Sequence, residues 1–536
     1  MAVTLGLRLF GSLAATLTAY GLYRGLKVIY EQITSPLRHL PGPKSKSWIY
    51  GNFKEIWEAE NSVLHEQWIQ EYGPTIQYAG ILGMRRLYTT DTKALNHILM
   101  HSDIYEKPDV ARYNLSRVLG EGVLVVEGDK HRQQRKVMNP AFGPSQVREL
   151  TEIFFAKAIQ LRDIWAADNA NQGGASRVDA LSWLSRTTLD VIGLAGFNYN
   201  FNALSEDPGQ NELNAAFSVM FKAGIKLSLI PLLRGWFPLL RFLRTEQDAK
   251  ADEARKTMNR IANQLLRESK ASIHDKSEWK TRDLLSLLVK SNMDTAIPEN
   301  QRMTDQDVLA QVPTFLVAGH ETTSTGTTWA LYALTQDKRV QDKLRQELLA
   351  VDTDTPTMDE LNALPYLDMV VRETMRVHAP VASTIRSAVK DDILPLSKPF
   401  TDRKGVVHDT VRVNEGQTLL IPILAINRDK SIWGEDAMEF RPERWEKVPE
   451  AAAAIPGVWG NMLTFLGGPR ACIGYRFSLV ETKALLFTLI RAFEFELAVP
   501  VKDIVKKSSV VQRPVLVTDP EGRNQMPLLI KSVVRA

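Results

Sequence analysis

The sequence predicts a mainly α-helical protein with small β-sheets, built as one large domain. Apolar residues recur at helical spacing over long stretches, most clearly across residues 147–164 and from Thr304 to about Leu334. Segments with the alternation of a β-strand are few and short. No Pro-, Gly- or Ser-rich linker follows residue 50, so residues 51–536 are predicted to form one domain, although 536 residues alone would suggest several.

The longest helix predicted in the body of the chain begins after Thr304. This residue is a candidate N-cap, and Asp307 lies in the first turn. A helix from there to about Leu334 would span roughly 45 Å and cross a whole domain. Pro313, Gly319 and Gly326 lie inside it, so we expect the helix to be locally irregular.

Two β-hairpins are predicted in the second half of the chain. Residues 411–413 and 418–423 flank a turn signal at 414–416. Residues 515–518 and 528–531 flank a second turn signal at 519–522. Each pair of segments is expected to form neighbouring antiparallel strands.

The first 30 residues predict a membrane anchor, and residues 31–50 predict a proline-rich hinge. Residues 9–23 form an uncharged run of 15 residues, close to the ~20 apolar residues that span a bilayer. Arg24 and Lys27 follow the run, which places that flank in the cytoplasm. The alternative is a cleaved signal peptide, but its small-residue cleavage site is lacking and the basic residues follow the apolar run. The sequence L-P-G-P at residues 40–43 predicts a stiff break.

Charge and cysteine content exclude several classes of function. The net charge is +4, and residues 1–50 hold six basic residues against one acidic residue. The body is therefore close to neutral and has no basic footprint for nucleic acid. A single cysteine excludes an internal disulfide framework and a zinc site with several thiolates.

The only cysteine, Cys472, lies in the decapeptide F-L-G-G-P-R-A-C-I-G at residues 465–474. The glycines and the proline predict a tight turn. The apolar run that follows predicts a helix, whose N-terminus would stabilise a thiolate. A loop that presents one thiolate is suited to ligate the iron of a flat haem, and thiolate donates electron density that favours O–O cleavage. The alternative is a buried structural cysteine.

This decapeptide resembles the signature F-x-x-G-x-R-x-C-x-G of the cytochrome P-450 family. Residues 373–376 (E-T-M-R) resemble the family's E-x-x-R motif, and residues 440–445 resemble its P-E-R-F segment with Trp in place of Phe. The resemblance covers roughly residues 36–535 and is closest to eukaryotic microsomal members, above all fungal ones. It implies a single cytochrome P-450 fold with an N-terminal transmembrane helix, and a buried ionic triad of Glu373, Arg376 and Arg444.

Residues 318–323 (A-G-H-E-T-T) resemble the family's oxygen-activation motif in the long central helix. The resemblance implies that Gly319 leaves room where the helix passes the haem. Thr322 would donate a hydrogen bond to bound oxygen, and Glu321 would take part in a proton relay. A metalloprotease motif is excluded, because Ser324 stands where H-E-x-x-H requires the second histidine.

The resemblance also implies the residues that bind haem b (iron protoporphyrin IX). Residues 131–135 resemble the family's W-x-x-x-R helix, with His131 in place of Trp. Cations facing the two haem propionates would anchor the cofactor through charge-assisted hydrogen bonds. The predicted haem-binding residues are the metal ligand Cys472, Phe465 in the same loop and, for the propionates, His131, Arg135, Arg386 and Arg470.

The resulting functional prediction is a monooxygenase that inserts one oxygen atom from O₂ into a lipophilic substrate, with a terpenoid or another secondary metabolite as the expected class. Alternatives are a fatty-acid or xenobiotic hydroxylase, a peroxide-rearranging haem-thiolate isomerase, and a haem-binding sensor without catalysis. The resemblance implies electrons from a membrane-bound NADPH–cytochrome P-450 reductase, a flavoprotein, and a catalytic domain on the cytosolic side of the endoplasmic reticulum. Predicted reductase contacts are Arg132, Lys136, Arg441 and Arg476. Predicted pocket positions are 113–118, Phe315, Leu316, Ala318, 381–385, Val510 and Val511.

Overall fold

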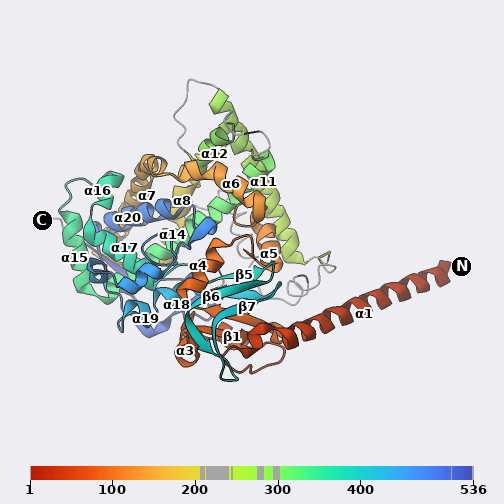
Figure 1. Cartoon of the computed structure of the whole chain (residues 1–536). Coiled ribbons are helices and arrows are strands. Elements are labelled where there is room, and N and C mark those ends of the chain that lie inside the picture. Colours follow the sequence, from red (N-terminus) through yellow and green to blue (C-terminus); the bar gives the residue numbers. More distant parts are fainter. Residues whose placement is uncertain are drawn as a thin grey trace. The chain divides into compact units, whose positions relative to one another are not determined.

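The computed structural model describes residues 2–205, 245–274, 283–293, 302–508 and 510–533, and the single positions 212, 234, 241, 242 and 298. The chain divides into two compact units (Figure 1). The first comprises residues 1–106 and 383–425, and the second comprises residues 107–382 and 426–536. Helices dominate and the sheets are small, as the sequence predicts.

The first unit is built around a five-stranded sheet in the order β1-β2-β8-β5-β3. All of its pairs are antiparallel except β2 with β8. A separate antiparallel pair, β6 with β7, belongs to the same unit. The strands are β1 (Thr75–Ala79), β2 (Arg85–Thr89), β3 (Tyr105–Glu106), β5 (Thr384–Ala388), β6 (Asp392–Thr401), β7 (Val407–Val413) and β8 (Thr418–Ile421). The helices are α1 (Ala2–Thr34), α2 (Phe53–Glu58), α3 (Val63–Tyr72) and α4 (Thr92–Met100), and α18 (Ile423–Asn427) continues into the second unit.

The second unit contains most helices and two small sheets. One sheet has the order β4-β12-β9, and the other pairs β10 with β11. The strands are β4 (Ala175–Asp179), β9 (Phe493–Leu497), β10 (Ile504–Ser508), β11 (Gln512–Leu516) and β12 (Pro527–Ser532). The helices are α5 (Asp109–Leu119), α6 (Gly128–Met138), α7 (Pro144–Asn171), α8 (Ala180–Phe197), α11 (Glu246–His274), α12 (Leu284–Met293), α13 (Asp305–Leu309), α14 (Gln311–Gln336), α15 (Lys338–Leu349), α16 (Met358–Asn362), α17 (Pro365–Val377), α19 (Lys430–Trp433) and α20 (Tyr475–Ala492).

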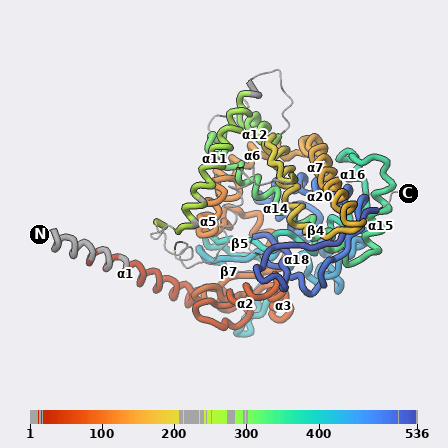
Figure 2. The backbone as a smooth tube through the Cα atoms, turned by 180° about the vertical axis from the view of Figure 1, so that it is seen from behind, coloured from red at the N-terminus to blue at the C-terminus, as the bar shows by residue number. Residues whose placement is uncertain are grey.

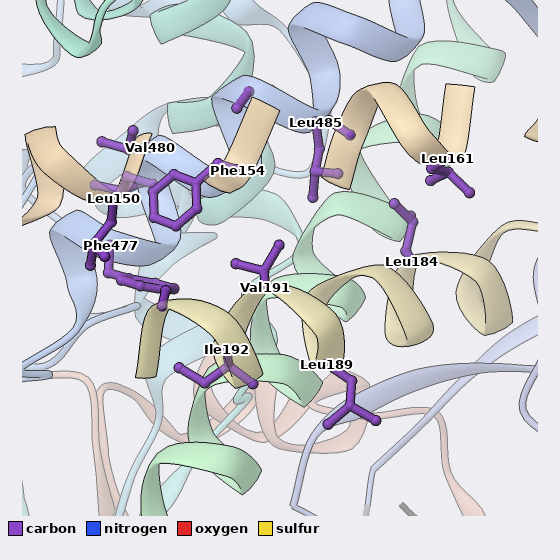
Figure 3. Close-up of a cluster of buried hydrophobic side chains, with 14 of the residues drawn as sticks. Leu150, Phe154, Leu161, Leu184, Leu189, Val191, Ile192, Phe477, Val480 and Leu485 are labelled. Carbon is purple, nitrogen blue, oxygen red and sulfur yellow. The ribbon is translucent and has the colours of Figure 1, made fainter. Parts of the chain in front are cut away.

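The core of the second unit lies where α7, α8, α14 and α20 pack against one another (Figure 2). In α7, Leu150, Phe154 and Leu161 recur at helical spacing on one buried face. Figure 3 shows them beside Val191 of α8 and Leu485 of α20. Each such side chain contributes about 1.5–3 kcal/mol through removal from water, so these helices form a firm frame for the residues that α14 and α20 carry.

The long helix predicted from Thr304 is divided in the structure. Thr304 caps the short helix α13 and forms a capping box with Asp307. A new helix, α14, begins at Gln311 and continues to Gln336. The division places Pro313 in the first turn of α14, where its missing N–H costs no helical hydrogen bond. Gly319 and Gly326 remain inside α14.

Both predicted hairpins are wrong. β7 pairs with β6, whereas β8 pairs with β2 and β5 in another sheet. Likewise, β11 pairs with β10, whereas β12 pairs with β4 and β9. The strands exist close to where alternation places them, but their partners lie elsewhere in the chain because alternation and turn residues do not specify a partner.

The N-terminal segment is one helix, α1, of 33 residues. Among the residues that the structure describes, no helix is long and apolar enough to cross a membrane, so the predicted transmembrane span is not found. Serine, threonine and glycine, together with Arg8, interrupt the apolar residues of this segment.

The predicted hinge packs against the sheet of the first unit. Leu37 and Leu40 are buried, and the carbonyl oxygen of Pro41 accepts a hydrogen bond of 2.9 Å from the Gln77 N–H. A Cβ on Gly42 would lie 2.0 Å from the Gln77 oxygen, so only glycine fits this close approach.

Candidate functional site

The cysteine loop is held in shape by backbone contacts. Cys472 lies just before α20, and its N–H donates to the Phe465 oxygen at 2.9 Å. Gly468 has φ +68°, a conformation that glycine adopts without steric cost. A Cβ on Gly467 would lie only 1.8 Å from the oxygen of Pro456. The loop therefore depends on glycine at both positions and presents its sulfur at a fixed point.

The Cys472 thiol is both accessible and surrounded by protein. Its residue is exposed, yet desolvation by the surrounding chain raises the pKa of the thiol. A hydrogen bond from the Gly474 backbone and the charge of Arg135 act in the opposite direction and favour the thiolate. An accessible sulfur leaves room for a ligand beside it and does not fit the alternative of a cysteine packed in the core.

A buried ionic triad forms where the sequence places it. Arg376 donates from Nε and Nη2 to both oxygens of Glu373, at 2.9 and 2.8 Å. Arg444, in the 3₁₀ helix of residues 442–446, lies 3.4 Å from the same carboxylate. Trp445 Nε1 and the Arg441 N–H each donate to it at 3.0 Å. Such completed hydrogen bonding is what a buried ion pair requires.

Two residues that sequence reasoning missed connect this triad to the cysteine loop. Arg376 Nη1 donates to the Asn427 oxygen at 2.9 Å. The Asn427 side chain accepts from the Leu463 N–H at 2.9 Å and donates to Thr464 Oγ1 at 2.8 Å. Thr464 in turn donates to the Met375 oxygen at 2.7 Å. No local pattern marks Asn427, because its partners are distant in sequence.

Two of the cations predicted for the haem propionates, Arg135 and Arg470, belong to or contact the cysteine loop. Arg135 Nη1 donates to the oxygen of Ala471, next to the cysteine, at 2.7 Å. Arg470 donates to the Val126 oxygen at 3.0 Å and forms an ion pair with Glu127. Arg470 therefore already faces a carboxylate of its own chain.

His131 is buried on α6, and its pKa falls to about 4 through desolvation and the nearby cations Lys107, Arg135 and Arg132. The imidazole is therefore neutral at physiological pH, and its ring N–H can serve as a hydrogen-bond donor. Because the family's tryptophan is also a neutral N–H donor, the histidine preserves that property.

Arg386 lies on β5 in the other unit. It is buried, and burial lowers its pKa to about 10. Its hydrogen-bond acceptors are neutral, Thr384 Oγ1 at 3.1 Å and the Ile385 oxygen at 2.7 Å. A buried guanidinium with neutral acceptors is suited to an anionic ligand.

Phe465 of the cysteine loop packs against two other aromatic rings. The centroid of its ring lies 5.6 Å from that of Trp459 and 5.9 Å from that of Tyr475.

On α14, Thr322 and Glu321 have different surroundings. Thr322 Oγ1 donates to the Ala318 oxygen at 2.6 Å, one turn back. Ala318 is exposed and Thr322 half-buried, although most of α14 is buried. By contrast, the predicted pocket residues Phe315 and Leu316 are buried in the core. The accessible stripe of α14 thus runs along Ala318 and Thr322.

Glu321 is held ionised. Its carboxylate forms an ion pair with Arg513 and lies 3.4 Å from His320 Nε2. Burial acts to raise the pKa of Glu321, but His320 and Arg513 outweigh it and hold the pKa at about 2. Sequence reasoning missed Arg513, which lies 192 positions from Glu321.

Gly319 lies where α14 meets α8, and its predicted role beside a haem stays a prediction. A Cβ at this position would lie 3.0 Å from two carbons of Ile192. The missing side chain therefore leaves room for α8 to pack closely on α14. Helix packing, and not clearance for a cofactor, is the contact that this structure shows.

Glu481 is a second residue that the sequence analysis missed. It lies on α20, fully buried, and neither carboxyl oxygen meets hydrogen-bond geometry within the described structure. Burial raises the pKa of Glu481 well above its ordinary value, and the nearby Thr323 hydroxyl offsets this only in part. The sequence signal that could have identified Glu481 is an acidic residue inside the apolar run that follows Cys472.

Comparisons with known proteins agree with this geometry. A family model described as cytochrome P-450 matches residues 41–518. Cytochrome P-450 monooxygenase 205 of Postia placenta is 56% identical over 528 residues, covering 97% of each chain. Cytochrome P-450 monooxygenase claP of Ampulloclitocybe clavipes is 34% identical over 520 residues, 93% of this chain and 94% of the relative. Ganoderic acid synthetase of Ganoderma lucidum is 34% identical over 530 residues, 94% of this chain and 95% of the relative.

Proposed function

Because the chain belongs to the cytochrome P-450 family, as a monooxygenase that binds haem b, we propose that it oxidises a lipophilic secondary metabolite, with a terpenoid as the preferred class. The observation that carries the reaction type is the single thiol of Cys472, accessible yet enclosed, on a loop fixed by glycines. The substrate class is supported by the relative named ganoderic acid synthetase.

Cys472 is proposed to hold the haem through its iron, and the haem, when bound, would supply the activation of O₂. The chain's own contribution begins with the loop. Arg135 holds the carbonyl next to the cysteine, and the Gly474 N–H favours the thiolate. Within the second unit, His131, Arg135 and Arg470 are proposed to contact the propionates.

Helix α14 provides the groups that are proposed to transfer protons. Thr322 is proposed to pass a proton from its hydroxyl to the reacting oxygen and to regain one from Glu321. In the described structure the Thr322 hydroxyl donates to Ala318, so its O–H must turn away from that carbonyl to serve this role. A hydroxyl one turn from its own carbonyl acceptor can exchange partners at little cost.

Electrons are proposed to come from an NADPH–cytochrome P-450 reductase that docks on the exposed basic residues near the cysteine loop. Arg132 and Arg441 pair with Asp129 and Asp436 and remain more than half exposed. Arg476 lies over the Tyr475 ring. An acidic partner would compete for these cations and gain a faster encounter.

Attachment to the endoplasmic reticulum membrane through α1, with a cytosolic catalytic body, is part of the proposal. It is supported by the uncharged run of residues 9–23 and the basic residues that follow. Alkaline carbonate extraction of microsomes from cells that express the full chain distinguishes integration from peripheral binding. The sequon at Asn114, the only one in the sequence, should stay unglycosylated, and a glycan there would reverse the topology.

The decisive test is reconstitution of the full chain with haem, reductase and NADPH in microsomes, followed by a screen of terpenoid, fatty-acid and xenobiotic panels. We expect oxygenated terpenoid products that depend on NADPH and O₂. Faster turnover of fatty acids or xenobiotics would show that these compounds, and not terpenoids, are the substrate class. Turnover of a peroxide without NADPH would favour the rearranging isomerase, and the absence of any substrate-induced spectral change would favour a sensor.

A further inference from the structure

One contact in the relay region joins distant parts of the second unit. Arg513 of β11 reaches the Glu321 carboxylate of α14, and only 16% of each side chain is exposed. The charged and titratable groups that act on Glu321 are Arg513 and, from its own helix, His320. His320 is fixed by its own bond from Nδ1 to the Leu316 oxygen at 2.9 Å. Of the two groups, Arg513 has the longer side chain, with more rotatable bonds through which it could change partner.

The backbone beside Arg513 is anchored on both sides. The Gln512 N–H donates to the Pro380 oxygen at 2.7 Å. The Gln512 oxygen accepts from Trp329 Nε1 of α14 at 2.8 Å. β11 also pairs with β10 along its whole length. Since the strand is fixed against α14, any change in the ion pair must come from the long Arg513 side chain itself.

This ion pair conflicts with proton delivery. A carboxyl group with a pKa of about 2 is protonated in roughly one molecule in 10⁵ at pH 7. It therefore has almost no proton to give while Arg513 is in place. Burial acts to raise the pKa of Glu321, and His320 and Arg513 both lower it; loss of the arginine removes one of these two opposing groups, so the pKa rises.

We infer that Arg513 is a positioning residue that controls the relay: it holds Glu321 ionised between turnovers, and a swing of its side chain releases the carboxylate to take up a proton. Released Glu321 accepts one proton from solvent and gives it to Thr322, whose own hydroxyl proton goes to the reacting oxygen. The balance is one proton in and one proton delivered, and Arg513 stays protonated throughout. This inference rests on the proposed function.

The test compares Arg513→Met, Arg513→Lys and Glu321→Gln in the full haem-loaded chain. Arg523→Met serves as the matched control, because Arg523 is exposed and pairs with Asp519 and Glu521 instead. The first readout is infrared spectroscopy: each protein's spectrum minus that of the same protein carrying Glu321→Gln isolates the Glu321 carboxyl. We expect a protonated-acid carbonyl band in Arg513→Met at mildly acidic pH, and none there in wild type, Arg513→Lys or Arg523→Met.

The second readout is product formed per NADPH consumed, as a function of pH. We expect Arg513→Met to lose the flat profile of wild type and to titrate where its new infrared band titrates. Arg513→Met/Glu321→Gln should behave as Glu321→Gln alone, since the two residues act as a unit. A wild-type profile and no acid band in Arg513→Met would overturn the inference.

The two proposals fail in different ways. A wild-type chain without the absorbance band near ~450 nm of the reduced CO complex would overturn the haem-thiolate function. A normal band with an unchanged pH profile in Arg513→Met would overturn only the role of Arg513. If Arg513→Met does not fold, Arg513→Gln, which keeps a polar side chain, takes its place in both readouts.

Discussion

Glu373 and Glu321 both face arginine, yet their surroundings differ in a way that explains their roles. Glu373 is completely buried and accepts from two arginines, a tryptophan and a backbone N–H. Glu321 retains some exposure and has Arg513 as an ion-pair partner, with His320 Nε2 at 3.4 Å. Saturated hydrogen bonding makes the first cluster rigid, whereas the second depends on one flexible side chain. The same chemical pair thus stabilises structure in one region and, in our proposal, controls proton delivery in the other.

The largest effect is expected at the sulfur of Cys472. Cys472→Ala should abolish the ~450 nm band of the reduced CO complex and all monooxygenation, because no second thiol exists in the chain. Difference spectroscopy of the purified protein measures this. Cys472→Ser is the matched variant, and a surviving band in either protein would assign the iron to another ligand.

The next largest effect tests the rigidity of the Glu373 cluster. Glu373→Gln removes the carboxylate that pairs with the buried Arg376 and leaves Arg444 with Asp436 as its counter-charge, which should cost about 3–5 kcal/mol of stability and lower haem retention. Denaturant unfolding and the haem-to-protein ratio report it. The exposed pair of Arg339 with Glu443 is the control, since Arg339→Met should cost under about 1 kcal/mol. Equal losses in the two variants would remove the contrast between the regions.

At Thr322 we expect a loss of coupling between NADPH consumption and product, and no loss of stability. Thr322→Ala should keep the fold and haem but lower product per NADPH by roughly tenfold, with hydrogen peroxide formed instead. Peroxide and product are measured together under one NADPH flux. Thr327→Ala is a matched control because this hydroxyl also bonds a carbonyl one turn back, at 2.9 Å. Unchanged coupling in Thr322→Ala would exclude it from the relay.

The smallest effect on activity is expected at Glu481, which stands in neither cluster. The folded protein keeps this carboxyl protonated to a higher pH than the unfolded chain does. Stability from the neutral form is therefore present at low pH and is lost as pH rises. The free energy of unfolding of Glu481→Gln should therefore exceed that of wild type by about 1 kcal/mol for each pH unit above the ordinary carboxyl range. Thermal unfolding between pH 5 and pH 8 measures this, and parallel curves would contradict a protonated Glu481.

Sequence reasoning succeeded where the determinant is local and failed where it is distant. The helix after Cys472 and the proline start of α17 follow from residues within a few positions of each boundary. The pairing of β7 with β6, and not with β8, depends on contacts that alternation does not encode. Likewise, nothing near Arg513 in the sequence points to Glu321. The structure shows which distant residues are in contact, and these contacts determine how firmly a charged side chain is held.

The accessibility of Cys472 gives the protein a built-in gauge of cofactor loading. Since it is the only cysteine and is exposed when nothing covers it, a thiol reagent should modify one sulfur per cofactor-free chain and none in loaded chains. The raised pKa of the thiol makes that labelling slow at neutral pH and faster in mild alkali. A stoichiometric mass shift can therefore count empty molecules in a preparation without any measurement of turnover.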